Sequence, residues 1–235
     1  MKLLKQYFLL LIFFSATGCR MIKENTSYSM ESGWYKSTIS EKSQLFWVQF
    51  TDTVIQLFPF QTKKEVNKNN PFIFSFNEMA QPGSPAFLKL SKSSLDIDVL
   101  TIPFKYRSSI AGFPNQLNTN FSTAIYAGFR NDRYRFFFST NPVGGQRKEL
   151  KHFGIGVGVF TGLGSTAMNP WTTQDQVQSE YDGFVFMNGI AGIVAVSNFT
   201  FGVGIGLDAL LDKNKRYWIY QHKPWIGLTV GLNIN

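Results

Sequence analysis

Residues 199–207 read FTFGVGIGL, and this alternation is the clearest indication of the fold in the sequence. Large apolar side chains take every odd position, and threonine or glycine takes every even position up to 206. Successive residues of a β-strand point to opposite faces, so the alternation predicts a strand with one bulky face and one nearly bare face. Glycine inside a strand costs entropy and offers nothing to pack, so the core of a soluble sandwich does not explain the bare face.

The same alternation recurs along the second half of the chain. It is clearest in 153–159 (FGIGVGV) and 226–234 (IGLTVGLNI), and it continues in segments with larger groups on the small face: 95–99 (LDIDV), 121–130 (FSTAIYAGFR) and 134–138 (YRFFF). Residues 184–196 (FVFMNGIAGIVAV) are also apolar but ambiguous in phase. With one more strand assumed from the preceding region, these segments predict an all-β, antiparallel membrane β-barrel of about eight strands over 91–235.

The composition favours lipid outside such a barrel. Of the 20 glycines, 13 lie beyond residue 150, the chain has 24 Phe, and its charged fraction is only 16%. Average soluble domains carry about 25% charged residues. Outward bulky side chains would meet lipid, and inward glycines would leave room for large residues of other strands. Several segments also reach the roughly 9 to 11 residues of a tilted membrane strand.

The barrel hypothesis assigns places to two sets of side chains. Charged residues on the small-residue faces would lie in the lumen and pair there, because an unpaired buried charge is costly. Aromatic residues in or near the loops 164–183 and 209–224 would form a girdle at the membrane surface. The predicted lumen charges are Asp96, Asp98, Arg130, Arg133, Arg135 and Asp208, and the predicted interface aromatics are Trp171, Tyr217, Trp218, Tyr220 and Trp225.

Residues 34–90 are predicted to form a small β region. Strands are predicted at 43–50, 53–59 and 71–76, with a hairpin turn between the first two. This region either caps the barrel or contributes strands to its wall.

The first residues are typical of a secretory signal. Residues 1–19 combine early lysines, an apolar run and a small-residue stretch that ends at Cys19. The sequence Ala16 to Cys19 resembles the lipobox of bacterial lipoproteins, and this resemblance implies lipidation of Cys19. An ordinary cleaved signal with an incidental cysteine is the alternative. Residues 20–33 are polar and aperiodic and are predicted to be a tether.

The pattern from 95 to 235 resembles small bacterial outer-membrane β-barrel proteins. The resemblance implies location in the cell outer membrane, contact with its lipid, and a structural role or the binding of an unknown protein or surface ligand. Three alternatives stay open: a narrow transport pore, a lipid-modifying barrel enzyme, and a lipid-anchored soluble β-sandwich in the periplasm. A membrane-spanning helix over 183–207 is a further alternative, although its glycines disfavour it.

We identify no catalytic residues, no cofactor site and no metal site from the sequence. An enzymatic hypothesis places Ser165 or Glu180 next to His222, while both histidines (His152 and His222) are otherwise predicted to lie at the surface. Acidic residues within 175–182 would bind a cation only loosely. The formal charge is +8, or 8 − 2 = +6 without Lys2 and Lys5, and the basic residues are scattered, so nucleic acid is not an expected partner.

Overall fold

The protein is all-β, as the sequence predicts, and its strands form one large antiparallel sheet. The structure is a computed structural model that describes residues 30–39, 42–51, 54–61, 65–75, 87–140, 146–196 and 199–232. The strands are β1 (Gly33–Ile39), β2 (Lys42–Phe50), β3 (Val54–Pro59), β4 (Phe72–Ser75), β5 (Phe87–Arg107), β6 (Gln116–Asn118), β7 (Ser122–Thr140), β8 (Gln146–Met168), β9 (Tyr181–Val196), β10 (Phe199–Leu210) and β11 (Pro224–Leu232).

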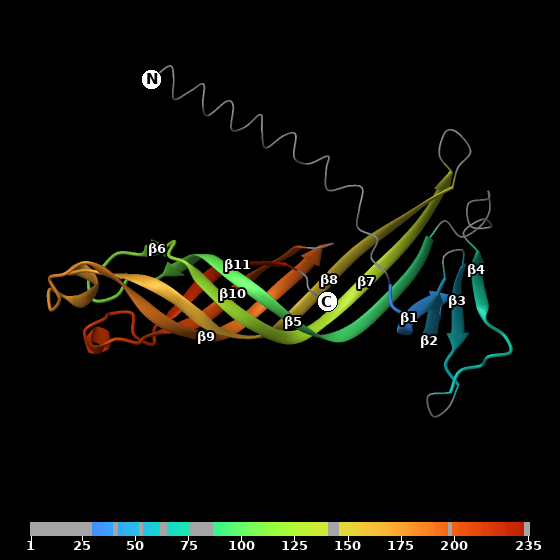
Figure 1. Ribbon diagram of the computed structural model, residues 1–235, viewed down its shortest axis with the longest axis horizontal. Helices are drawn as coiled ribbons and strands as arrows, with labels where there is room; N and C mark the ends of the chain where they lie inside the picture. The colour runs from blue at the N-terminus through green and yellow to red at the C-terminus, as the bar shows by residue number, and fades with distance from the viewer. Residues whose placement is uncertain are drawn as a thin grey trace, which may run out of the picture. The chain divides into compact units, whose positions relative to one another are not determined.

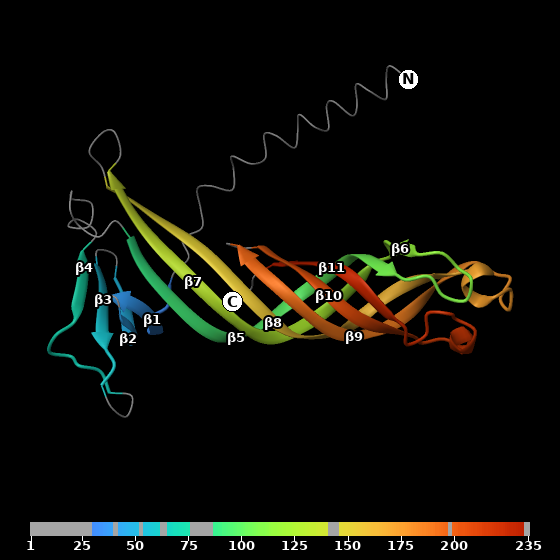
Figure 2. The same ribbon diagram turned by 180° about the vertical axis from the view of Figure 1, so that it is seen from behind.

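Six of these strands form a ring. The hydrogen-bonded order runs β5-β7-β8-β9-β10-β11, and β11 pairs back with β5 from Ile226↔Tyr106 to Leu232↔Val99. Figures 1 and 2 show the ring from its two sides. We call the end where β9 leads into β10 the hairpin end, and the opposite end, which carries the segments 108–121, 169–180 and 211–223, the loop end.

The ring differs from the predicted count of about eight strands because two predicted strands are one. Residues 121–130 and 134–138 belong to the single 19-residue strand β7. Asn131 pairs with Ser93, and Asp132 pairs with Gly154, so the ladder continues where a break was expected. The strand assumed from the preceding region does not enter the ring.

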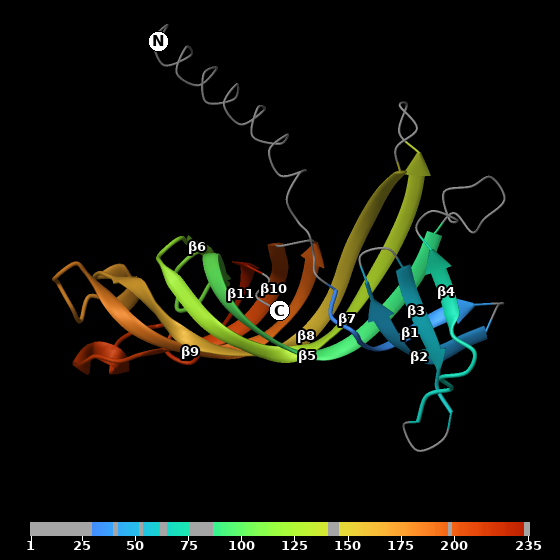
Figure 3. The same cartoon turned by 45° about the vertical axis from the view of Figure 1, so that its right-hand side comes forward.

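The N-terminal strands continue the sheet beyond the ring's hairpin end. There β5, β7 and β8 extend past their ring partners, and Figure 3 shows them curving outward. β1 joins the extended part of β5 through Lys36↔Ser91 and Ser37↔Leu90, and β2, β3 and β4 follow in order. A separate group of buried side chains lies here, namely Tyr35, Phe46, Val48, Ile55, Leu57, Leu88, Leu90 and Phe136.

The predicted hairpin between 43–50 and 53–59 is confirmed by the antiparallel pair of β2 and β3. β1 was not predicted. The helical alternative for 183–207 is wrong, because this stretch lies in β9 and β10. Within the described ranges, no helix is long and apolar enough to cross a membrane.

An irregularity in β5 decides which side chains enter the ring at the loop end. Leu228 pairs with Phe104, but Val230 pairs with Thr101, so β5 has one extra residue opposite Thr229. A bulge of this kind shifts the alternation of the bulged strand by one residue. Proline lacks the backbone N–H that a ladder needs and is typical of such sites, and here Pro103 occupies the irregularity. Beyond it, Lys105 and Arg107 are buried, although uninterrupted alternation would expose them.

Candidate functional site

An apolar belt surrounds the six-stranded ring. The odd-numbered apolar residues of 95–99, 121–129, 153–159 and 199–207 are the ones expected to face outward, and the largest of them are exposed. Phe129 is 76% exposed and Val157 65%. Members of the belt are Leu95, Ile97, Val99, Phe104, Tyr106, Phe121, Ile125, Phe129, Phe153, Ile155, Val157, Val159, Leu163, Phe184, Phe186, Ile190, Val194, Val196, Phe199, Phe201, Val203, Ile205, Leu207, Ile226 and Leu228.

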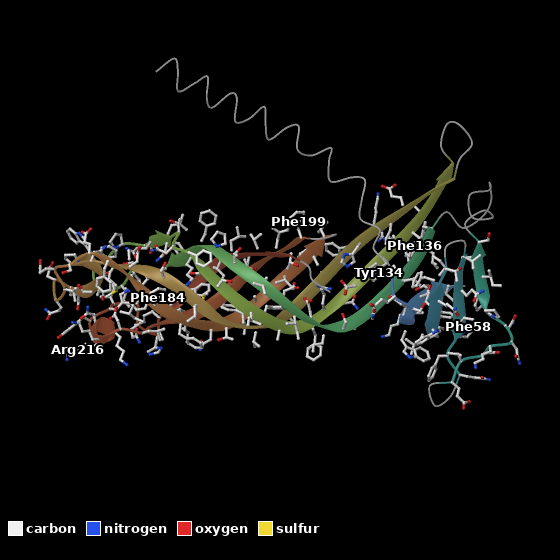
Figure 4. All side chains as sticks on the ribbon, viewed as in Figure 1. Phe58, Tyr134, Phe136, Phe184, Phe199 and Arg216 are labelled. Carbon is white, nitrogen blue, oxygen red and sulfur yellow. The ribbon has the colours of Figure 1, made fainter. Side chains whose placement is uncertain are left out.

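The belt has defined edges. On β8 the outward positions from Phe153 to Leu163 hold no charged residue, whereas Lys151 is exposed just before them. On β9 the charged Asp182 is exposed just before Phe184 at the loop end. Figure 4 labels Phe184 and Phe199, which lie near the two ends of the belt. The belt is therefore about as tall as a membrane strand requires, roughly 9 to 11 residues.

The interior of the ring is filled. Its central cluster consists of Leu100, Ile102, Ala124, Tyr126, Phe160, Met187, Ala191, Ile193 and Trp225. Glycines make room for the largest rings, as the sequence predicts: a Cβ atom on Gly206 would lie 2.5 Å from the Trp225 ring, and one on Gly189 would lie 2.6 Å from Phe160. The wall is thus apolar on both faces at mid-height.

A buried charge network closes the interior near the loop end. Asp208 accepts hydrogen bonds from Lys105 Nζ at 3.1 Å and from Trp225 Nε1 at 2.8 Å, and it pairs with Arg107. Arg107 also donates to Thr166 Oγ1 at 3.2 Å. Two cations thus share one carboxylate in a site with little access to water.

Aromatic rings cover this network. The Arg107 guanidinium lies 5.0 Å from the centroids of both the Trp218 and the Tyr220 rings, a cation–π geometry. Both rings belong to a buried cluster with Met168, Val185 and Leu210. Burial raises the pKa of Tyr220, although the charge of Arg107 acts to lower it.

A second network lies in the interior toward the hairpin end. Arg130 Nη1 is 2.8 Å from Asp96 Oδ1, and Arg130 Nε is 3.0 Å from Asp132 Oδ1. Asp132 Oδ1 is also 2.7 Å from His152 Nε2, and the His152 ring stacks on Tyr134 at 4.8 Å. Asp98 accepts a hydrogen bond from Thr200 Oγ1 at 3.3 Å.

Four of the six predicted lumen charges are buried, namely Asp96, Asp98, Arg130 and Asp208. Arg133 and Arg135 are instead exposed on the outward face of β7. Their prediction is wrong because 134–138 was assigned to a separate strand of opposite phase. Four interior groups were missed: Lys105, Arg107, Asp132 and His152. Pro103 inside an otherwise regular strand was the available signal for the first two.

The prediction for the five interface aromatic residues is wrong for three of them. Trp171 is 72% exposed and Tyr217 is half-buried, with the Arg216 guanidinium 4.5 Å from its ring centroid. Trp218, Tyr220 and Trp225 are buried, so they form no girdle. They turn inward because the network around Asp208 offers Trp225 Nε1 an acceptor and the other two rings a guanidinium.

The loops 164–183 and 209–224 contact each other at the loop end. The Ile219 N–H donates to Thr172 O at 3.0 Å, and the Tyr181 hydroxyl donates to Asp212 at 2.7 Å. An open groove lies beside the latter contact, lined by Gln176, Val177, Ser179, Tyr181, Asp212, Lys213 and Asn214. The two predicted loops therefore form one connected surface.

Among the described residues of this surface, His222 is not bonded to either residue of the enzymatic hypothesis. The His222 ring lies 3.2 Å from Gln221 Nε2, and in the described part of the chain no hydrogen bond or ion pair joins His222 to Ser165 or Glu180. Across the same residues, no group of three His, Cys, Asp or Glu side chains is placed to hold a metal ion. The predicted surface position of His152 is wrong, because its ring is buried against Asp132.

The predicted signal peptide and the predicted lipidation site at Cys19 lie outside the described residues, as does most of the predicted tether. No family model matches the chain, and neither a curated protein nor a solved structure matches it.

Proposed function

We propose that the ring is a closed β-barrel embedded in the bacterial outer membrane, where the protein has a structural or surface-binding role. The proposal includes export by the 1–19 signal and a lipid on Cys19 as a further anchor. The connected loop surface is the proposed contact face for a partner or ligand. Both chain ends of the ring lie at the hairpin end, which would face the periplasm.

The apolar belt is the observation that carries this proposal. Monomeric soluble proteins rarely expose contiguous apolar patches of more than a few hundred Å², and this belt extends over every strand of the ring. Closure supports the same reading, because lipid cannot satisfy the hydrogen bonds of an open sheet edge.

The filled interior favours a structural or binding role over a pore. Even eight strands leave an interior just wide enough for side chains, and six leave less. The central cluster around Trp225 and Phe160 occupies that space. No observation favours the lipid-modifying enzyme, since His222 has no nucleophile or acid bonded to it within the described residues. A lipid-anchored soluble protein would leave the belt in water.

The proposal is tested by placing arginine at two heights on the outward face. Val157 lies at mid-belt on β8 and is 65% exposed, so Val157→Arg should cost a soluble fold almost nothing. In a bilayer, arginine near the midplane costs about 2–4 kcal/mol. We therefore expect Val157→Arg to lower the free energy of unfolding by that amount, measured by urea titration in phospholipid vesicles.

Ala167→Arg is the matched control, because Ala167 is outward and exposed on the same strand but pairs with Asp182, which lies past the belt edge at the loop end. Arginine near or outside the interface costs about 0–1 kcal/mol. Equal unfolding free energies for the two variants, together with recovery of the wild-type protein in the soluble fraction, would overturn the membrane proposal.

A further inference from the structure

We propose that a basic groove on the outward face of β1, β5 and β7 binds the phosphate of a phospholipid headgroup. The inference rests on the proposed membrane location and adds a lipid site to it. The groove has a volume of about 280 Å³ and no carboxylate lines it. Its lining residues are Lys36, Ser37, Thr38, Ser43, Lys89, Leu90, Ser91, Arg133, Tyr134 and Arg135.

The strand register gathers the cations. Lys89 is directly opposite Arg135, and Arg135 is directly opposite Lys151 on the next strand. Like charges directly opposite each other destabilise a sheet. Within the described residues, no ion pair involves any of these three side chains or Arg133. A bound anion would remove this repulsion.

The chemistry of the groove suits a phosphate group. A guanidinium group binds phosphate oxygens through two parallel hydrogen bonds. Arg133 and Arg135 supply two guanidinium groups. Lysine adds a point charge, supplied by Lys36 and Lys89. Thr38 lines the same groove. A threonine hydroxyl can donate to a phosphate oxygen.

The position of the groove favours a lipid as the source of the phosphate. Arg133 pairs with Phe153, the last belt residue of β8 at the hairpin end. The cations thus begin where the apolar belt stops, which is where headgroups lie relative to the hydrocarbon core. Nearby rings add an apolar flank: Lys89 Nζ is 4.8 Å from the Phe87 ring, and Lys151 Nζ is 4.9 Å from the Phe137 ring.

The test is a calorimetric titration of the full chain, folded in uncharged maltoside micelles, with dioctanoyl phosphatidate. We expect saturable binding that weakens at least tenfold in the double variant Arg133→Gln/Arg135→Gln. The control Lys215→Gln/Lys223→Gln removes the same charge from exposed residues at the loop end and should bind as the wild type does. Arg133→Lys/Arg135→Lys should bind with intermediate affinity, because it keeps charge but loses bidentate geometry.

Two further probes identify the source of the phosphate. Dioctanoylglycerol, which lacks the phosphate, should not bind, and inorganic phosphate should bind far more weakly than phosphatidate. Equal affinity for inorganic phosphate, or an equal loss in the loop-end control, would overturn the headgroup site. This failure is separate from that of the membrane proposal, which is decided by the stability of Val157→Arg against its control and by the fractionation of the wild-type protein. Circular dichroism of each variant confirms that it is folded.

Discussion

At the scale of single residues, Asp208 holds the loop end of the ring together. It is buried with Lys105 and Arg107, and its Oδ1 also accepts the Trp225 N–H at 2.8 Å. Removing one partner of a buried ion pair leaves an uncompensated charge, which typically costs about 3–5 kcal/mol. Here the loss of one carboxylate leaves two cations without a counter-charge.

We therefore expect Asp208→Asn to lower the free energy of unfolding by about 3–5 kcal/mol, measured by urea titration in detergent micelles. Asp175→Asn is the control, because Asp175 lies exposed in a loop and its change should stay within about 0.5 kcal/mol. Adding Lys105→Met to Asp208→Asn should restore part of the loss by removing one stranded cation. If Asp208→Asn is as stable as the wild type, the network around Asp208 does not stabilise the loop end.

The residue scale also shows what the sequence could predict. Asp96, Asp98, Arg130 and Asp208 were predicted to be inside because each lies on the small-residue face of a clear alternation, and they are buried. Trp218 and Tyr220 were assigned to the membrane surface on residue type alone. Both rings pack on Arg107, which uninterrupted alternation along β5 would expose, so the sequence of their own loop does not indicate their burial.

At the scale of strands, phase errors account for the remaining differences. Alternation along 153–159 and 199–207 predicted the outward faces of β8 and β10, because neither strand is interrupted. In β7 the polar residues Asn131 and Asp132 interrupt the apolar alternation, and the prediction of 134–138 as a separate strand reversed the phase of that segment. The bulge in β5 and the continuity of β7 across its polar residues are both determined by pairing with other strands, whose residues lie far away in the sequence.

The glycines of paired strands give the test at this scale. Gly206 faces the interior, where a Cβ atom would lie 2.5 Å from Trp225 Cζ2 and 2.9 Å from Asn188 O. Trp225 is held by its bond to Asp208 and cannot retreat easily. We expect Gly206→Ala to cost about 1–3 kcal/mol through overpacking, measured as the loss in the free energy of unfolding.

Gly192→Ala is the matched substitution on β9. A Cβ atom there meets nothing within 4 Å, so the variant should be as stable as the wild type or up to about 1 kcal/mol more stable. If the two alanine variants are equally stable, the interior is not packed around Trp225 as described.

At the scale of the whole molecule, the described strands divide into a ring and a sheet extension. The ring was predictable as a set of alternating segments, because all of its strands except β9 carry a clear alternation. The attachment of β1 to β5 was not predictable. Only Lys36↔Ser91 and Ser37↔Leu90 join the two strands, and the sequence of neither strand indicates its partner. For the same reason, the groove at this junction could not be predicted from the sequence.

The most direct test of the central claim measures what surrounds the outward face. With Cys19 replaced by serine, single cysteines at positions 151 to 163 of β8 carry a nitroxide spin label in protein reconstituted into phospholipid vesicles. We expect oxygen accessibility to alternate with a period of two, to be greatest near Val157, and to exceed accessibility to a water-soluble nickel complex at every outward site of the belt. If the nickel complex reaches Val157 as readily as it reaches Lys151, the belt is exposed to water, and this result would contradict the proposal that lipid surrounds it.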